Sequence, residues 1–423
     1  MSGYKTTLIT SRLSERGEAV ARGRNGLVFV PYALAQETIV AEVDGLRGTL
    51  AEIVEASPHR IASHCRYFSH CGGCAVQTLA APNYAQWKRE LIAAALRRAG
   101  LASEVMGLVD AHGQGRRRAT FHTRYKEGKP ATGFMQSRAH KIVEIDSCPL
   151  FAPSLANALL IARAIGETLA SSQKLLDIRV TATASGLDVD VKGHGAFDDQ
   201  QRLALVRIAL ELDLARLSNH GEVLLTQRMP LIPIGKAVVA PPPGAFLQAT
   251  EAGEEVLATR VCAQIAGVKR IADLFSGIGT FALRMAEFAA VSAFDVDDRA
   301  LSALAKAACT APLRPLAVAR RDLFRHPLNQ MELEDFDAAL FDPPRAGAEN
   351  QARALAASSV PFIVGVSCNA KTFARDAAIL CAGGYELMPV EPIDQFRHTP
   401  HVEIIAFFRR CASRPRRKRS VLG

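Results

Sequence analysis

The sequence predicts an α/β protein in which a doubly wound, Rossmann-like sheet follows a small N-terminal β-barrel and a central α+β region. Two patterns lead to this fold class. From residue 269 onward, the strand-like runs RIADLF, SAFDV, DAALFD and FIVGVSC alternate with helical stretches, which is typical of a parallel doubly wound sheet. Before residue 58, short alternating strands follow one another with turns between them, which indicates a small β-barrel or a β-meander.

These patterns divide the chain into four parts. We expect a barrel over residues 1–57, a central region over residues 58–268, the doubly wound sheet over residues 269–412, and a disordered basic tail over residues 413–423. The central region opens with a stretch rich in Cys, His and Gly. A predicted helix follows it and ends at Gly100.

Composition limits the classes of protein. The 423 residues include 51 Lys and Arg against 42 Asp and Glu, a formal net charge of +9, which is compatible with a polyanionic partner such as nucleic acid. No apolar run is long enough to span a membrane, and the N-terminus lacks the apolar core of a secretory signal, so we expect a cytoplasmic protein. In that reducing compartment, nine cysteines, an odd number, do not fit a disulfide framework.

A basic segment lies at Gln114–Lys141. It holds eight Lys and Arg residues against one Glu, interleaved with Phe121, Tyr125 and Phe134 in an alternating pattern that predicts strands. Cations and aromatic rings on a sheet bind single-stranded RNA through phosphate contacts and base stacking. A solvated sheet face explains the same pattern, so this segment alone leaves both interpretations open.

A glycine-rich turn follows the first predicted strand of the doubly wound sheet. In Asp273-Leu-Phe-Ser-Gly-Ile-Gly-Thr280, two glycines let the backbone approach a ligand, and the following helix offers free N–H groups. The next strand ends at Asp295, whose carboxylate can accept both hydroxyls of a ribose. Together these features indicate an adenosine-containing cofactor. The turn lacks the third glycine of the dinucleotide fingerprint and is similar to the S-adenosylmethionine site of class I methyltransferases.

Two further strand ends carry reactive groups. Phe341-Asp-Pro-Pro-Arg345 predicts a stiff loop that presents a carboxylate and an arginine, because its prolines fix φ and remove backbone donors. Cys368 ends the next strand, where a thiol that faces the cofactor is placed as a nucleophile. A lone cysteine at a strand end is otherwise a small core residue. The D-P-P motif alone also fits a methyltransferase that acts on nitrogen, which needs no thiol.

A thiol and a methyl donor together suit methylation of an unactivated ring carbon. Attack of a thiolate on C6 of uracil turns C5 into an enolate carbon that can take a methyl group, and a base must then remove the C5 proton. The sequence offers Glu403 at the head of the last strand-like run, with His398 nearby, because a buried carboxylate with a raised pKa suits proton abstraction. Without Cys368, Glu403 would be an ordinary charge on an edge strand.

Five motifs occur in order between residues 246 and 403: FLQ, DLFSGIGTF, FDPPRAG, VSCN and PHVE. In this combination the chain resembles the RNA uracil-5-methyltransferase family, in particular its 23S ribosomal-RNA branch. The resemblance implies Cys368 as nucleophile and Glu403 as base. It also implies a set of residues around S-adenosylmethionine, namely Gln248, Phe275, Thr280, Asp295, Asp322 and Asp342. Thr280 and Asp295 depart from the family's usual Asn and Glu but keep the capacity for hydrogen bonds.

Four cysteines are candidate metal ligands. Cys65-x5-Cys71-Gly-Gly-Cys74 is followed much later by Cys148-Pro149. Four thiolates suit a tetrahedral Zn²⁺ ion or a [4Fe–4S] cluster, and the spacing alone, which favours zinc, does not decide between them. The resemblance implies a [4Fe–4S] cluster, because the ribosomal-RNA branch carries this spacing as a cluster site. We expect its role to be structural, since the chemistry above needs no electron.

The N-terminal barrel resembles the small TRAM-like (OB-like) RNA-binding domain that accompanies the ribosomal-RNA branch. Together with the cysteines it favours 23S ribosomal RNA over transfer RNA as the substrate, and we expect a monomer that binds no membrane. Two other functions stay open: methylation of a nucleobase nitrogen, and a non-catalytic role in RNA binding or assembly. Substitution of Cys368 tests the first, and dialysis against S-adenosylmethionine tests the second.

Overall fold

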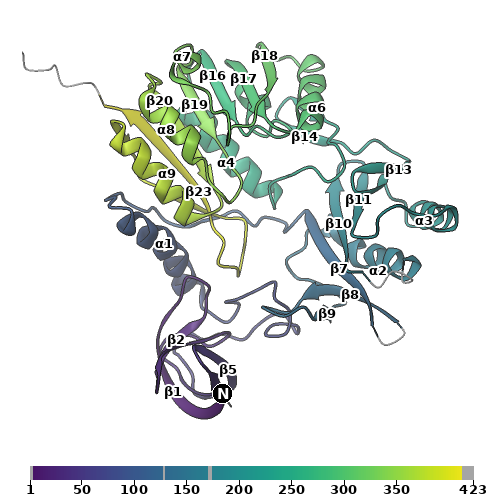
Figure 1. Cartoon of the computed structure of the whole chain (residues 1–423), viewed down its shortest axis with the longest axis vertical. Coiled ribbons are helices and arrows are strands. Elements are labelled where there is room, and N and C mark those ends of the chain that lie inside the picture. Colours follow the sequence, from purple (N-terminus) through teal and green to yellow (C-terminus); the bar gives the residue numbers. More distant parts are fainter. Residues whose placement is uncertain (1–2, 127–128, 170–173, 412–423) are drawn as a thin grey trace, which may run out of the picture.

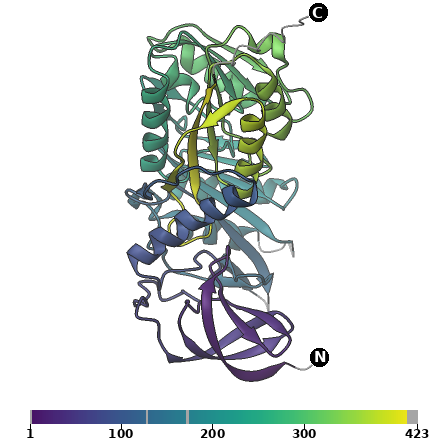
Figure 2. The ribbon, with the colours of Figure 1, turned by 90° about the vertical axis from the view of Figure 1, so that its left-hand side faces the viewer.

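The computed structural model describes residues 3–126, 129–169 and 174–411, and the predicted basic tail lies outside these ranges. Three β structures are arranged along the long axis of the molecule, with a barrel at one end, a seven-stranded sheet in the middle and a nine-stranded sheet at the other end (Figures 1 and 2). This arrangement confirms the predicted fold class. Within the described ranges, no helix is long and apolar enough to cross a membrane.

The N-terminal barrel is closed, in the strand order β1-β2-β3-β5-β4. Apolar residues alternate along its strands, so Val28, Val30, Ile39 and Ala41 point inward and form its core. Of the two predicted forms, a barrel or a meander, the barrel is therefore correct. Its strands are β1 (Tyr4–Leu13), β2 (Ala19–Gly23), β3 (Gly26–Val30), β4 (Thr38–Asp44) and β5 (Arg47–Glu55).

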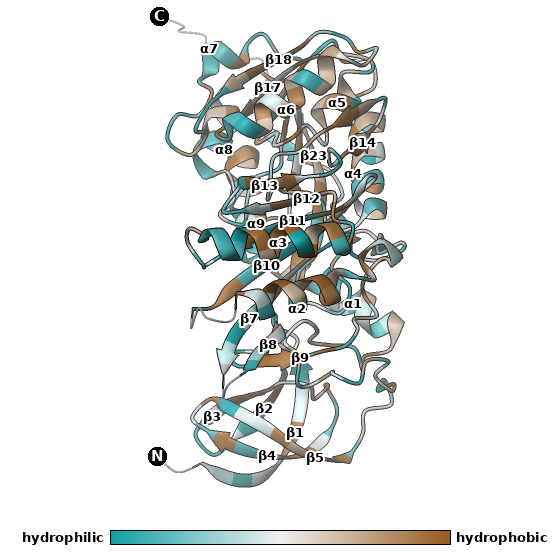
Figure 3. Cartoon of the chain, turned by 90° about the vertical axis from the view of Figure 1, so that its right-hand side faces the viewer, coloured by the Kyte–Doolittle hydropathy of each residue, from teal (hydrophilic) through white to brown (hydrophobic). Residues whose placement is uncertain are grey.

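The middle sheet contains the basic segment. Its order is β13-β12-β11-β10-β7-β8-β9. Helix α2 (Ala158–Thr168) packs its apolar side on strands β7, β8 and β10, and α3 (Asp199–Glu211) packs beside it (Figure 3). The strands are β7 (Arg118–Lys126), β8 (Lys129–Met135), β9 (Ile142–Glu144), β10 (Leu176–Thr183), β11 (Gly186–Lys192), β12 (Arg216–Asn219) and β13 (Glu222–Thr226). A 3₁₀ turn at Pro153–Leu155 leads into α2.

The C-terminal sheet has a parallel part and an antiparallel part. The parallel strands lie in the order β18-β17-β16-β19-β20, and β23 continues the sheet antiparallel to β20. The parallel strands are β16 (Arg270–Leu274), β17 (Ala290–Asp295), β18 (Leu316–Arg320), β19 (Ala338–Phe341) and β20 (Phe362–Ser367). The other strands are β6 (Val109–Asp110), β21 (Tyr385–Leu387), β22 (Glu391–Asp394) and β23 (Glu403–Arg410).

Helices cover both faces of this sheet, as a doubly wound fold requires. One face is covered by α4 (Glu251–Gln264), α5 (Ala282–Met285) and α6 (Asp298–Cys309), together with the ribbon of β14 (Ile232–Ile234) and β15 (Ala237–Val239). The other is covered by α1 (Ala81–Arg98), α7 (Gln330–Leu333), α8 (Glu349–Ala357) and α9 (Ala370–Ala382). Because α1, α4 and β6 precede residue 269, the sheet draws elements from both sides of that predicted boundary.

Candidate active site

The carboxyl ends of the parallel strands carry several of the predicted site residues, together with Asp273, the first residue of the glycine-rich motif. Asp273 lies in β16, Asp295 ends β17, and Asp342 and Cys368 directly follow β19 and β20. Strand order reverses between β16 and β19, and ligands of doubly wound sheets bind at such a switch point. The four residues therefore meet at the edge of the sheet where a cofactor is expected.

The glycine-rich turn is held against the end of β17. The backbone N–H of Gly277 donates to Asp295 Oδ2 at 2.9 Å, and the N–H of Asp297 donates to Oδ1 at 2.9 Å. Gly279 has a φ of 93°, and a Cβ there would lie 2.3 Å from Leu304 Cδ1, so only glycine fits. Each oxygen of Asp295 keeps a second lone pair for a ligand.

An apolar surface opens beside this turn. Phe275 packs on Phe324 with ring centroids 5.3 Å apart, and Phe324 and Val296 are 40% and 54% exposed. Asp322 accepts the N–H of Phe324 at 3.0 Å and so fixes the turn that carries this ring. Exposed apolar side chains next to strand-end carboxylates suit a purine nucleoside. The hydroxyl of Thr280 has no hydrogen-bond partner among the described residues.

The predicted nucleophile and base lie on neighbouring strands. In the antiparallel register of β20 and β23, Ser367 pairs with Ile404, which places Cys368 next to Glu403. The pKa of the Cys368 thiol is raised to about 11, chiefly by burial and in addition by the charges of Glu403 and Asp342, while the charge of Arg345 opposes the shift. The sequence-predicted pair is thus brought together by strand pairing.

Glu403 is almost fully buried, with an exposed fraction of 2%. Burial raises its pKa to about 8, and the nearby charge of Asp342 acts in the same direction. A hydrogen bond from Gln395 and the charge of Arg118 oppose this shift. The carboxylate is consequently poised to exchange a proton near neutral pH.

Two glutamine side chains connect Glu403 to Asp342. Gln395 Nε2 donates to Glu403 Oε2 and to Gln248 Oε1, each at 2.7 Å. Gln248 Nε2 donates in turn to Asp342 Oδ2 at 3.2 Å. Asp342 is partly accessible to solvent, and desolvation by the surrounding protein raises its pKa to about 7. Gln248 was predicted from its motif, whereas a single glutamine such as Gln395 gave no sequence signal.

A cation and an aromatic ring border the same site. The guanidinium of Arg118 lies 4.8 Å from the ring centroid of Phe246, and Phe246 is 62% exposed. Burial lowers the pKa of Arg118 to about 10, and the charges of Arg179 and Arg116 add to this effect. The sequence marked the basic segment as a whole, but nothing in it distinguished Arg118 from its neighbours.

The loop after β19 is braced by α9. The Nδ2 of Asn369 and the hydroxyl of Thr372 donate to the carbonyl of Arg345 at 3.3 and 3.2 Å. Arg345 Nη2 lies 3.2 Å from His401 Nε2. Burial lowers the pKa of His401 to about 4, and the Arg345 charge contributes, so the ring is neutral near pH 7 and can accept this hydrogen bond. Arg345 is thereby held beside Cys368.

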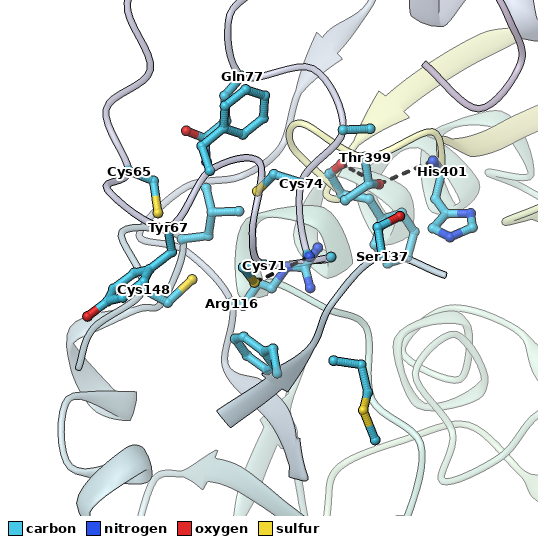
Figure 4. Close-up of a pocket in the computed structure, with 18 of the residues that line it drawn as sticks. Cys65, Tyr67, Cys71, Cys74, Gln77, Arg116, Ser137, Cys148, Thr399 and His401 are labelled. Carbon is cyan, nitrogen blue, oxygen red and sulfur yellow. Dashed lines mark hydrogen bonds between the residues drawn. The ribbon is translucent and has the colours of Figure 1, made fainter. Parts of the chain in front are cut away.

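A cavity of about 650 Å³ adjoins the site (Figure 4). It extends from Arg345 and His401 to the barrel residue Arg16. Its wall includes arginines from all three β structures or the loops that join them, namely Arg16, Arg116, Arg118, Arg138, Arg179 and Arg345. Concentrated positive charge in a concave surface attracts polyanions.

The four predicted ligand cysteines line one part of this cavity. In Figure 4 the sulfur atoms of Cys65, Cys71, Cys74 and Cys148 border a common space. Burial raises the pKa of Cys74 to about 12 and also raises those of Cys71 and Cys148, and each of these thiols is affected by the charge of other members of the set. In the part of the chain that the structure describes, no group of three or more His, Cys, Asp or Glu side chains is arranged to hold a metal ion.

Known proteins that are similar to this chain are described as RNA methyltransferases. The sequence profile of a family described as tRNA (Uracil-5-)-methyltransferase matches residues 257–411. A Brucella suis protein described as an uncharacterized RNA methyltransferase is 44% identical over 408 residues, which cover 96% of this chain and 98% of the relative. A 23S rRNA (uracil(1939)-C(5))-methyltransferase of Chromohalobacter salexigens is 31% identical over 433 residues, covering 97% of this chain and 90% of the relative.

A solved structure has the same overall fold. The tRNA (uracil-54, C5)-methyltransferase of Pyrococcus abyssi, in complex with S-adenosyl-L-homocysteine, superposes with a TM-score of 0.72. The match covers 95% of this chain and all of that chain, at 22% sequence identity. The likeness therefore extends over the barrel, the middle sheet and the doubly wound sheet.

Proposed function

Since the chain belongs to the RNA uracil-5-methyltransferase family and is an RNA methyltransferase that depends on S-adenosylmethionine, we propose that it methylates C5 of a uracil in 23S ribosomal RNA. The proposed reaction proceeds through a covalent adduct between the protein and the RNA. The observation that carries the proposal is the adjacency of Cys368, directly after β20, and Glu403, at the start of the paired strand β23. The 23S substrate is supported by the similarity to the Chromohalobacter enzyme over nearly the whole chain.

The proposed chemistry uses one thiol and one carboxylate. The Cys368 thiol loses its proton to solvent, Sγ forms a bond to C6 of the uracil, and the C5–C6 π electrons move toward O4 to give an enolate. S-adenosylmethionine supplies the methyl group that C5 takes up. Glu403 then accepts the C5 proton, the C5–C6 double bond returns, and the S–C6 bond breaks to release the thiolate.

The proton affinities of the two groups fit this order of events. The Cys368 thiol is protonated in the free protein, because its pKa is about 11, and Arg345 is the nearby cation that favours its ionised form. Glu403, with a pKa of about 8, can take up the C5 proton in its ionised form, whose fraction grows as the pH rises through 8. Phe246 and Arg118 offer a ring for stacking and hydrogen-bond donors for a uracil that leaves its RNA stack.

The strand ends fit the cofactor. The Asp295 carboxylate is fixed by two backbone amides and can accept ribose hydroxyls, while Phe275 and Phe324 supply apolar surface for the base. We assign the full set from the family motifs: Gln248, Phe275, Thr280, Asp295, Asp322 and Asp342.

We assign Cys65, Cys71, Cys74 and Cys148 to a [4Fe–4S] cluster. The support is the spacing of the four cysteines, which is that of the ribosomal-RNA branch, and the fact that all four line the same cavity. A cluster there would cross-link the segment after the barrel to the middle sheet. The backbone already joins them through the Gly72 N–H, which donates to the carbonyl of Met135 at 2.9 Å. In this proposal the role of the cluster is structural.

The remaining parts serve RNA binding in this proposal. Residues 1–57 and 58–268 bind RNA along the arginine-lined cavity, and residues 269–412 carry the chemistry. We propose that the enzyme acts as a monomer in the cytoplasm.

A mechanism-based substrate tests the proposal. Incubation with S-adenosylmethionine and 23S fragments that contain 5-fluorouridine should give a methylated, covalent protein–RNA adduct, because fluorine at C5 cannot leave as a proton does. Cys368→Ser should abolish the adduct, and Cys309→Ser, an exposed cysteine on α6, should leave it intact. Mapping of the adduct identifies the uridine.

Other outcomes would overturn parts of the proposal. Turnover by Cys368→Ala would indicate methylation of a nitrogen. Preference for transfer RNA over the 23S fragments in the same assay would indicate that transfer RNA, and not 23S ribosomal RNA, is the substrate. Failure to bind S-adenosylmethionine in equilibrium dialysis would indicate a non-catalytic RNA-binding factor.

A further inference from the structure

Gln395 lies at the centre of the hydrogen-bond network between the base and the cofactor edge of the site. We propose that Gln395 is a positioning residue that orients the Glu403 carboxylate for removal of the C5 proton and links it, through Gln248, to Asp342. This inference rests on the proposed function. It adds a residue in the loop between β22 and β23, directly after β22.

The backbone fixes the orientation of the Gln395 amide. The N–H of Ala249 donates to Gln395 Oε1 at 2.9 Å, and a backbone N–H can only donate. The other end of the amide must therefore be Nε2, whose two hydrogens go to Glu403 and to Gln248. A rotation of the amide would place its oxygen against the Glu403 carboxylate and its nitrogen against the Ala249 N–H.

The orientation of the Gln395 amide also determines that of the Gln248 amide. Because Gln248 Oε1 accepts from Gln395, its Nε2 faces Asp342 Oδ2. All three members Gln395, Gln248 and Glu403 are buried to 3% exposure or less, so water does not compete for these bonds. One backbone amide thus determines the direction of every hydrogen bond from Glu403 to Asp342.

The surroundings of Glu403 explain why this donor matters. The charged or titratable groups near the carboxylate are Asp342 after β19, Cys368 after β20 and Arg118 on β7. Asp342 disfavours the ionised base, whereas Gln395 and Arg118 favour it. Loss of the Gln395 donor would leave Glu403 both less ionised and free to rotate away from the substrate.

Gln395→Met tests the inference, because methionine keeps the volume and removes the donor. With 23S fragments that contain natural uridine, kcat should fall about 10- to 100-fold, as for loss of a hydrogen bond to a charged group. KM for RNA should change little. The methylated covalent adduct should accumulate, since its formation needs Cys368 and only its release needs Glu403.

The pH profile separates positioning from a general loss of structure. Glu403 acts as a base only when it is deprotonated, so activity falls as pH drops through its pKa. Removal of the donor raises that pKa, and the acid limb of kcat should move to higher pH. Gln351→Met is the matched control: Gln351 is equally buried, its amide bonds the backbone of Leu328, and it lies outside the site.

Each outcome decides the inference. If Gln395→Met does not fold, Gln395→Glu replaces it, because it keeps an acceptor for the Ala249 N–H while removing the donor to Glu403, and the same limb should move upward. An unshifted pH profile without accumulated adduct overturns the inference, as does an equal effect of Gln351→Met. A wild-type protein that forms no methylated uridine overturns the proposed function, and the inference with it.

Discussion

At the scale of single residues, the site separates a protonated thiol from a carboxylate that titrates near neutrality. The pKa of Cys368 is raised to about 11 and that of Glu403 to about 8, in both cases chiefly by burial. The ionised Glu403 also disfavours the thiolate beside it. The free protein therefore carries a weakly reactive thiol, which protects Cys368 until a substrate fills the site.

Glu403→Gln should make Cys368 more reactive. Above pH 8 the wild-type carboxylate is mostly ionised and raises the pKa of the thiol, so its neutral replacement increases the thiolate fraction. Alkylation of Cys368 by iodoacetamide at pH 9, followed by mass spectrometry of the Cys368 peptide, should be about tenfold faster in the variant.

The control uses the same two proteins at pH 6. There the wild-type Glu403 is mostly protonated, since its pKa is about 8, and the two alkylation rates should be close to each other. If the variant and the wild type were alkylated at equal rates at both pH values, the charge of Glu403 would have no effect on the pKa of the Cys368 thiol.

Sequence reasoning at this scale succeeded where a motif marks a strand end. Cys368, Glu403, Asp342 and Gln248 were predicted, and strand pairing and hydrogen bonds bring them together. Gln395 could not be predicted, because its role depends on contacts with Gln248 and Ala249, which lie in a distant segment. Arg118 could not be distinguished from the other cations of the basic segment for the same reason, because its contact with Phe246 joins distant segments.

At the scale of elements, local patterns predicted the parallel strands and missed those defined by long-range pairing. Strands β16, β19 and β20 are largely apolar and buried on both faces, which a continuous apolar run reveals, whereas β17 alternates between half-buried and buried residues. Strand β18 (LAVAR) is a half-exposed edge strand with a weak pattern. Strand β6 is two residues long and exists because it pairs with β22.

The turn after β16 offers a test with a matched pair of glycines. Gly279 has a φ of 93° and no room for a Cβ beside Leu304, whereas Gly277 has a φ of 54° and open space around it. Gly279→Ala should lower the free energy of unfolding by about 2–4 kcal/mol, from strain plus overpacking. Gly277→Ala should cost about 1 kcal/mol.

Urea denaturation followed by circular dichroism measures both variants. Comparable losses for the two would mean that Leu304 moves aside without cost, and that the turn is set by φ alone. A larger loss for Gly277→Ala would contradict the packing argument for this turn.

At the scale of the whole molecule, α1 ties the parts around the active site together. The buried ammonium of Lys88 binds Asp394 Oδ1 at 3.0 Å, the carbonyl of Phe396 at 3.3 Å and the carbonyl of His401. The loop between β22 and β23, which carries Gln395, is thereby fastened to the helix that follows the cysteines. Breaking such a buried pair is costly, because it leaves an uncompensated charge.

The cysteine segment contacts the same loop directly. The N–H of Ala75, next to Cys74, donates to the carbonyl of His398 at 2.8 Å. On the other side, Trp87 of α1 packs with Leu34 of the barrel and Val76 of the cysteine segment. None of these links could be predicted from sequence, since each joins segments that carry no matching pattern. They bring the barrel, the cysteines and the base-carrying strand into one structure.

This continuity predicts that the barrel contributes to RNA binding through Arg16, an exposed residue that lines the cavity shared with Arg345. A contact with one phosphate should add about 0.7–0.9 to the slope of log Kd against log salt concentration. Arg16→Ala should therefore weaken binding of a 23S fragment and reduce that slope by this amount, in fluorescence anisotropy titrations from low to physiological salt.

The control is Arg207→Ala. Arg207 is also an exposed arginine, but it lies on α3 and does not line the cavity, so its substitution should change neither quantity. If both variants lowered the slope equally, the cause would be the net charge of +9 rather than a contact in the cavity, and RNA would not follow this path from the barrel to Cys368.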